Sequence, residues 1–192
     1  MNDAERWDKK WAEETHPSEP SAFFLRWLPR LLSHLRRRPG TQVLDVACGT
    51  GRHTLPLARA GVCVEAADIS EVALEKLAVR ARHEALSIHT RRLDLSNQQA
   101  RKLEIRTYDT ILDFFYLERP LFPVLARAAR PDALLLFETR LAGPVGTATN
   151  LKGFWLAPGE IQKLLWRDWK ILELFEGELA GGALVQVAAR RR

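Results

Sequence analysis

The chain has 192 residues, of which 46% are hydrophobic and 28% are charged, as expected for one globular domain with a substantial core. Its net charge of +5 would attract anions but is too small to indicate a nucleic-acid-binding protein by itself, and the basic C-terminal ARRR is expected to be solvated. Cys48 and Cys63 are the two cysteines, which excludes a disulfide framework and a cysteine-rich zinc site. A charged N-terminus and the lack of an apolar run of about 20 residues argue against a signal peptide and a membrane span, so we expect a cytoplasmic protein.

Two helices are predicted at the start of the chain. Trp7 and Trp11 share one face of a helix over residues 3–14, which the stretch THPSEP ends. Over residues 21–38 apolar residues recur at spacings of three and four, which predicts an amphipathic helix that stops at Pro39-Gly40.

After residue 40 strands and helices are predicted to alternate. The expected strands cover residues 41–47, 62–69, 86–94, 108–115 and 133–139, and the expected helices cover 51–60, 70–85, 97–104 and 118–130. A long loop over 140–156 and a helix over 158–166 then precede two strands, 169–177 and 183–191. The connection between these strands is too short for a crossover helix, so they should pair antiparallel. We therefore expect a doubly wound α/β domain, with a mostly parallel seven-stranded sheet, helices on both faces and an antiparallel last strand at the edge.

A glycine turn follows the first strand, in the stretch VLDVACGTGRHTLPLA over residues 43–58. A strand that ends in such a turn and opens into a helix brings backbone N–H groups close to a ligand. A dinucleotide site would have a third glycine, but Thr54 stands at that position after Gly49 and Gly51, which disfavours this class of cofactor.

Four aspartates are expected at the same edge of the sheet. Asp45 lies inside the first strand, where a carboxylate needs a partner, and the other three follow later strands: Asp68, Asp94 and Asp113. Each could be a local helix or turn cap. Their common position at carboxyl ends instead predicts a ligand site there.

These stretches carry a family resemblance. VLDVACGTGRHTLPLA, VEAADIS, RRLDL and YDTILDFFYLERPLF…LLLFET, over Gln42–Thr139, resemble the successive motifs of class I S-adenosylmethionine-dependent methyltransferases. The segment GFWLAPGEIQKLLWRDWKILELFEG and the tryptophan-rich first helix resemble the small-molecule subgroup of tellurite-resistance and thiopurine-type methyltransferases. The family often has Pro-Gly-Gly before the fifth strand where this chain has Pro-Asp-Ala, a change that we interpret as structural.

The resemblance implies a Rossmann-like fold, S-adenosylmethionine as the cofactor, and residues for each part of it. On the methionine side these residues are Asp45 for the amino group, the loop Ala47, Cys48, Gly49, Thr50 and Gly51, and Asp113 with Phe114 at the end where the methyl group leaves. On the adenosine side they are Asp68 for the ribose hydroxyls, Ile69 for the adenine face, and Asp94 with Leu95 for the adenine edge. No metal is expected.

The catalytic residue is left unassigned, because methyl transfer depends chiefly on alignment and a thiolate or oxyanion needs no general base. Candidates near the methyl group are His53, Tyr116, Glu118, Arg119 and Arg140. His53 could equally cap or pack a helix, and the arginines could be surface ion-pair partners. No prolines directly follow Asp113, which disfavours methylation of an amino group on a nucleic-acid base.

The sequence thus predicts a methyltransferase for a small-molecule acceptor such as a thiol or a metalloid oxyanion, without a membrane partner and as a monomer or homodimer. Residues 1–38 would form a helical cap, either a mobile lid or a docked helix, 41–139 the cofactor-binding core, and 140–192 the substrate loop and C-terminal hairpin, with Phe154 and Trp155 as pocket walls. Alternatives are a non-catalytic cofactor-binding module with a protein partner, and an RNA or protein methyltransferase.

Overall fold

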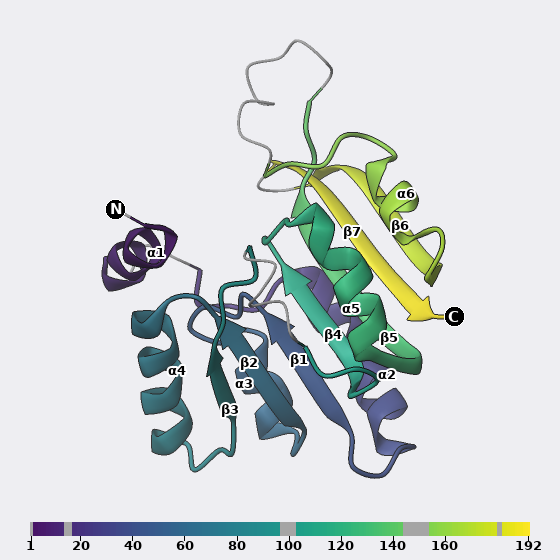
Figure 1. The fold of residues 1–192 in the computed structure, drawn as a ribbon. Coiled ribbons are helices and arrows are strands. Elements are labelled where there is room, and N and C mark those ends of the chain that lie inside the picture. The colour runs from purple at the N-terminus through teal and green to yellow at the C-terminus, as the bar shows by residue number, and fades with distance from the viewer. Residues whose placement is uncertain (1, 14–16, 97–102, 144–153, 180–181) are drawn as a thin grey trace.

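The sheet of the computed structural model confirms the doubly wound arrangement (Figure 1). The structure describes residues 2–13, 17–96, 103–143, 154–179 and 182–192. The strands are β1 (Gln42–Val46), β2 (Cys63–Asp68), β3 (His89–Arg92), β4 (Tyr108–Phe114), β5 (Ala129–Arg140), β6 (Trp169–Leu179) and β7 (Gly182–Arg191). They lie in the order β3-β2-β1-β4-β5-β7-β6. The order reverses between β1 and β4, and doubly wound sheets bind ligands at such a point.

The last strand is antiparallel to both of its neighbours, as predicted, but its place in the sheet differs from the prediction. β7 lies between β5 and β6, so the reversed strand is internal and β6 forms the edge. The hairpin folds back onto β5 because β7 carries a buried apolar run that needs cover on both faces, whereas β6 is only partly buried.

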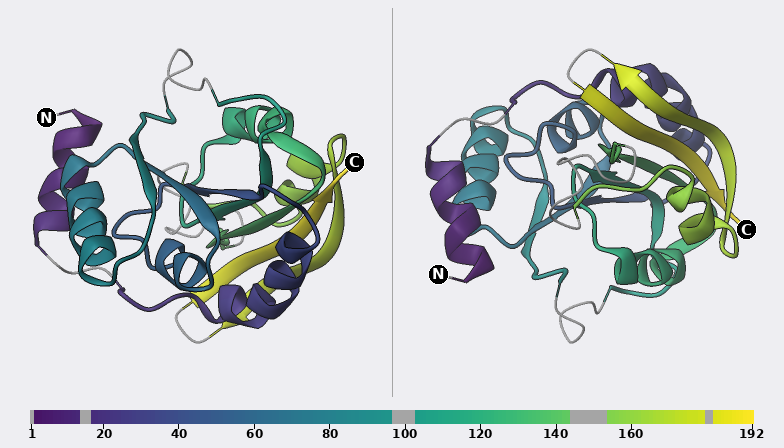
Figure 2. Two further views of the ribbon diagram at one scale, coloured as in Figure 1. Left: turned by 90° about the horizontal axis from the view of Figure 1, so that it is seen from below. Right: turned by 90° about the horizontal axis from the view of Figure 1, so that it is seen from above.

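Helices cover both faces of the sheet, as Figures 1 and 2 show. One face carries α2 (Ala22–Arg36), α3 (Thr54–Arg59) and α4 (Glu71–His83), and the other carries α5 (Phe122–Ala128) and α6 (Glu160–Leu165). The first helix, α1 (Asp3–Ala12), buries no residue and lies beside α4. Five buried side chains of α2, in contrast, belong to the core: Phe23, Phe24, Trp27, Leu31 and Leu35. A mobile lid can therefore involve α1 but not α2.

One predicted helix ends early. The helix expected over 118–130 consists of a 3-10 turn, η1 (Arg119–Leu121), and α5, while Ala129 already belongs to β5. Ala129 pairs with Tyr108 of β4, and this strand pairing outweighs the helical propensity of the AARP stretch. Most of the helix expected over 97–104 lies outside the described residues.

Candidate functional site

Backbone hydrogen bonds hold the glycine loop after β1. The Cys48 N–H donates to the Ala67 carbonyl at 3.0 Å, and the Gly51 N–H donates to the Cys48 carbonyl at 3.0 Å. Gly49 and Gly51 have φ values of 54° and 80°, a region that favours glycine, and Ala47 shares it at 49°. Cys48 is buried, and burial raises the pKa of its thiol, so it fills space rather than acting as a nucleophile.

Asp68 joins this loop to the next helix. Its Oδ2 accepts the Gly49 N–H at 2.8 Å and its Oδ1 accepts the Ser70 N–H at 2.8 Å, while Ser70 caps α4 as predicted. Burial raises the pKa of the Asp68 carboxyl. Each carboxylate oxygen has a second lone pair, so Asp68 can still accept hydroxyl donors such as those of a ribose.

Asp45 and Asp113 are the deeply buried carboxyls of the site, each 1% exposed. Asp45 accepts the Thr54 hydroxyl at 2.5 Å, and burial raises its pKa to about 7. Asp113 accepts a backbone N–H from Tyr116, and burial together with nearby Asp45 raises its pKa well above the usual range. Among the described residues, its Oδ1 has no hydrogen-bond partner. A buried orphan acceptor beside a second buried carboxyl fits a ligand that carries an ammonium and a sulfonium group.

The adenine-side candidates lie after β2 and β3. Ile69, the residue after Asp68, is half-buried, and Leu95, which follows β3 in the chain, is buried. Asp94 accepts the Ser96 N–H at 2.9 Å and the Ser96 hydroxyl at 2.6 Å. This turn is the local capping role that the sequence left open for Asp94, and a role in adenine recognition remains a prediction.

His53 is a packing residue by its contacts. Its Nε2 accepts the Ser21 N–H at 3.2 Å, and its ring lies 4.0 Å from that of Phe114 and 4.9 Å from that of Phe24. Burial lowers the pKa of His53 to about 2, so the imidazole is neutral and its acceptor nitrogen is occupied. These contacts do not support a role as general base.

Arg119 also has hydrogen-bond partners within the protein. Its guanidinium forms a two-bond ion pair with Glu160, at 2.5 and 3.0 Å, and donates to the Trp155 carbonyl at 3.1 Å. It thereby fixes the chain that leads from Trp155 into α6. Tyr116 and Glu118 are partly exposed after β4, and Arg140 is exposed at the end of β5. Phe154 is exposed and Trp155 is partly buried, and neither is shown to line a cavity.

Sequence reasoning missed three polar residues at the same end of the sheet: Glu138, Gln186 and Arg52. Glu138 on β5 is 2% exposed and accepts the Gln186 side-chain amide at 2.8 Å. Arg52 follows Gly51 directly, and its guanidinium lies 5.2 Å from the centre of the Phe115 ring. A charged residue inside the apolar run LLLFET was the available signal for Glu138, by the same argument that selected Asp45.

Helix α1 covers part of the glycine loop and the start of α4. The Trp11 indole lies directly on the Gly49 backbone, where any β-carbon would collide with it. Asp8 accepts the Ser70 hydroxyl at 2.6 Å, and the Lys76 ammonium donates to the Trp11 carbonyl at 2.7 Å. In this conformation α1 is docked, so the lid remains a prediction.

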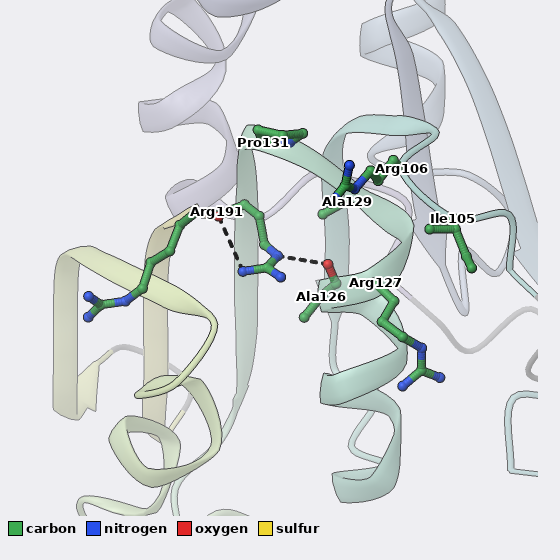
Figure 3. Close-up of a pocket in the computed structure, with 8 residues that line it drawn as sticks. Ile105, Arg106, Ala126, Arg127, Ala129, Pro131 and Arg191 are labelled. Atoms are coloured by element: carbon green, nitrogen blue, oxygen red, sulfur yellow. Dashed lines mark hydrogen bonds between the residues drawn. The ribbon is translucent and has the colours of Figure 1, made fainter.

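A pocket of about 210 Å³ lies at the opposite edge of the sheet, beside the start of β4 and the end of β7. Arg191 donates there to the Ala126 carbonyl at 2.8 Å, and Figure 3 shows the Arg127 side chain pointing away from it. The arginines do not converge on one point, so this pocket is not an anion cage. Within the described residues, no group of three or more His, Cys, Asp or Glu side chains could hold a metal ion, and no helix is long and apolar enough to cross a membrane.

Comparisons with known proteins agree with this geometry. Residues 43–131 match a family described as a methyltransferase domain. The chain is 37% identical over 89 residues to the 23S rRNA (uracil(1939)-C(5))-methyltransferase RlmD of Halomonas elongata, covering 46% of this chain and 18% of that protein. It is 30% identical over 104 residues to the ubiquinone biosynthesis O-methyltransferase of Hahella chejuensis, covering 53% and 44%. The chain thus spans less than half the length of these curated relatives.

The fold is similar to that of TehB from Haemophilus influenzae, with a TM-score of 0.72 and 19% identity over 97% of this chain and 67% of TehB. The family match covers the glycine loop, Asp68 and Asp113, and the strand order extends the likeness to the whole sheet. The predicted cofactor class agrees with this family. The match over residues 43–131 and the strand order of the sheet support a class I, S-adenosylmethionine-dependent methyltransferase domain.

Proposed function

We propose that the protein transfers the methyl group of S-adenosylmethionine to a small-molecule acceptor such as a thiol or a metalloid oxyanion. The observation that carries the proposal is the buried carboxyl pair Asp45 and Asp113 beside the glycine loop, with one acceptor oxygen of Asp113 unpartnered. The cofactor, when bound, supplies an electrophilic methyl group on a sulfonium.

In this proposal the chain's own residues bind and align. Asp45 and Asp113 face the positive charge of the methionine end, Asp68 accepts the ribose hydroxyls, and the buried Phe114 excludes water beside them. Because the Nε2 of His53 already accepts the Ser21 N–H and the pKa of its imidazole is lowered to about 2, the buried residues of the α3 turn supply no general base. This absence favours an acceptor that is already anionic, because a thiolate or oxyanion reacts without losing a proton.

Isothermal titration calorimetry with S-adenosylmethionine and its demethylated product, S-adenosylhomocysteine, tests the first step. We expect both to bind with Kd values in the micromolar range, and Asp68→Ala to abolish most of that binding because it removes the ribose acceptor. Arg59→Gln is a matched control, since Arg59 is exposed and forms an ion pair with Glu84. Absence of heat with either ligand would falsify the proposal.

An RNA methyltransferase is the second candidate, because one relative of similar sequence acts on 23S rRNA. A steep fall of RNA affinity with salt, together with methyl transfer to RNA, would favour it. Tight cofactor binding with no transfer to thiols, metalloid oxyanions, amines or RNA would indicate a non-catalytic module instead. A cytoplasmic location and the oligomeric state remain predictions.

A further inference from the structure

Arg52 is a half-buried cation whose ion-pair partner is not found among the residues that the structure describes. It has no hydrogen bond or ion pair with another described residue, and its one specific contact is the Phe115 ring, 5.2 Å from the guanidinium carbon. Glu138 and Asp45 act on it only through longer-range attraction, and burial lowers the pKa of its guanidinium. Its N–H groups are not among the buried polar atoms that lack a partner, so they reach solvent and are free to donate to a ligand that supplies acceptors.

The place of this pair in the fold indicates which ligand. Arg52 follows the glycine loop after β1, and Phe115 follows β4, the neighbouring strand across the switch point. The residue before Phe115 is Phe114, expected at the end where the methyl group leaves. If Asp45 and Phe114 border the methionine end as predicted, Arg52 lies on that side, since its guanidinium interacts electrostatically with Asp45 and Glu138.

Phe115 itself is strained and exposed. Its φ is 63°, a region that aromatic residues rarely adopt, and 42% of its surface is accessible. The Glu138 carbonyl accepts the Phe115 N–H at 2.7 Å and fixes this conformation. Strain of this kind persists where the surrounding structure requires the side chain in one place, often at a functional site.

We propose that Arg52 and Phe115 form the subsite for the methyl acceptor, an inference that rests on the proposed function. This subsite would bind a small aromatic or flat acceptor through a carboxylate or oxyanion group. The guanidinium carbon of Arg52 lies over the Phe115 ring, which offers an apolar surface, while the guanidinium N–H groups form the fork that matches a carboxylate. Arg119 cannot take this role in the observed conformation, because Glu160 occupies its fork. The methionine carboxylate of the cofactor has the same chemistry as the acceptor group, so the experiment must separate the two.

The test uses two thiols that differ by one carboxylate, 2-mercaptobenzoate and thiophenol, bound to the full chain in complex with S-adenosylhomocysteine. We expect 2-mercaptobenzoate to bind about tenfold or more tightly than thiophenol. Arg52→Gln should bring the ratio of the two Kd values near one, Arg52→Lys should restore part of it, and Arg59→Gln should leave it unchanged. Phe115→Leu should weaken both thiols.

The second part of the experiment compares the Kd of S-adenosylhomocysteine with that of 5′-methylthioadenosine, which lacks the amino-acid part. If Arg52→Gln weakens the first and spares the second, Arg52 binds the cofactor carboxylate and the inference is wrong. Equal affinity of the wild-type complex for the two thiols, or no binding of either, also overturns the inference while the methyltransferase proposal survives. Failure of the wild-type chain to bind S-adenosylhomocysteine defeats both. If thermal melting shows that Arg52→Gln does not fold, the ratio of the two thiol Kd values in the wild-type chain and in Arg52→Lys still tests the inference.

Discussion

Strand β4 carries a buried aspartate near each end, and each is 1% exposed. Asp109, near the start, accepts donors from Arg38 at 3.2 Å, Arg130 at 2.7 Å and the Gln42 N–H at 3.1 Å. Asp113, near the end, keeps an oxygen without a partner among the described residues. Two equally buried aspartates therefore differ in role: Asp109 holds structural hydrogen bonds at one edge of the sheet, and Asp113 is a ligand-binding candidate at the other. The hydrogen-bond partners make the difference, and burial alone does not.

The largest effect is expected from Asp109→Ala. This change leaves two arginines and a backbone N–H without their acceptor and should lower the free energy of unfolding by about 3 kcal/mol, less than for a fully buried pair because both arginines are partly solvated. Urea denaturation measures it, and calorimetry under native conditions should show unchanged S-adenosylhomocysteine affinity. A loss below about 1 kcal/mol would contradict the structural role.

Asp113→Asn should have the opposite profile. A carboxyl whose pKa is raised by folding costs stability as the pH rises above its unfolded value, about 3.9, so the neutral amide should stabilise the ligand-free protein by about 1 kcal/mol at pH 8 and by nothing near pH 3. Cofactor affinity should fall about thirtyfold through the loss of a charged acceptor. Urea denaturation at the two pH values and calorimetry check both parts. Destabilisation like that of Asp109→Ala would remove the contrast between the two ends of β4.

The smallest expected effect is a pH dependence of cofactor affinity. The pKa of Asp45 is about 7 without ligand, and a cationic ligand favours its ionised form. Below pH 7 the carboxyl is mostly protonated and must lose its proton when the ligand binds, which weakens binding. Affinity for S-adenosylmethionine should fall about tenfold between pH 7.5 and 5.5, as measured by calorimetry. Asp45→Asn should bind more weakly and lose most of this dependence. An unchanged slope in the variant would assign the titration to another group, with Asp68 first among them.

Much of the fold could be predicted because its signals are local. Hydrophobic periodicity, glycine turns and the Ser70 cap define elements over a few residues, and the structure agrees with them within a few positions. The order of β6 and β7 was missed, since strand order depends on which faces need cover across the whole sheet. The end of α5 was missed because Ala129 pairs with Tyr108, a contact that composition does not record.

The candidate site divides in the same way. The sequence by itself determined the family, the glycine loop and the aspartates at the strand ends, because each follows from residue type and spacing along one stretch of chain. Only the tertiary structure decided which polar groups are already paired. In it Arg119 pairs with Glu160 and His53 accepts from Ser21, whereas Asp113 and Arg52 lack full partners among the described residues. Hydrogen bonds between distant segments are set by how the elements pack, so spacing along the chain cannot reveal which charges still await a ligand.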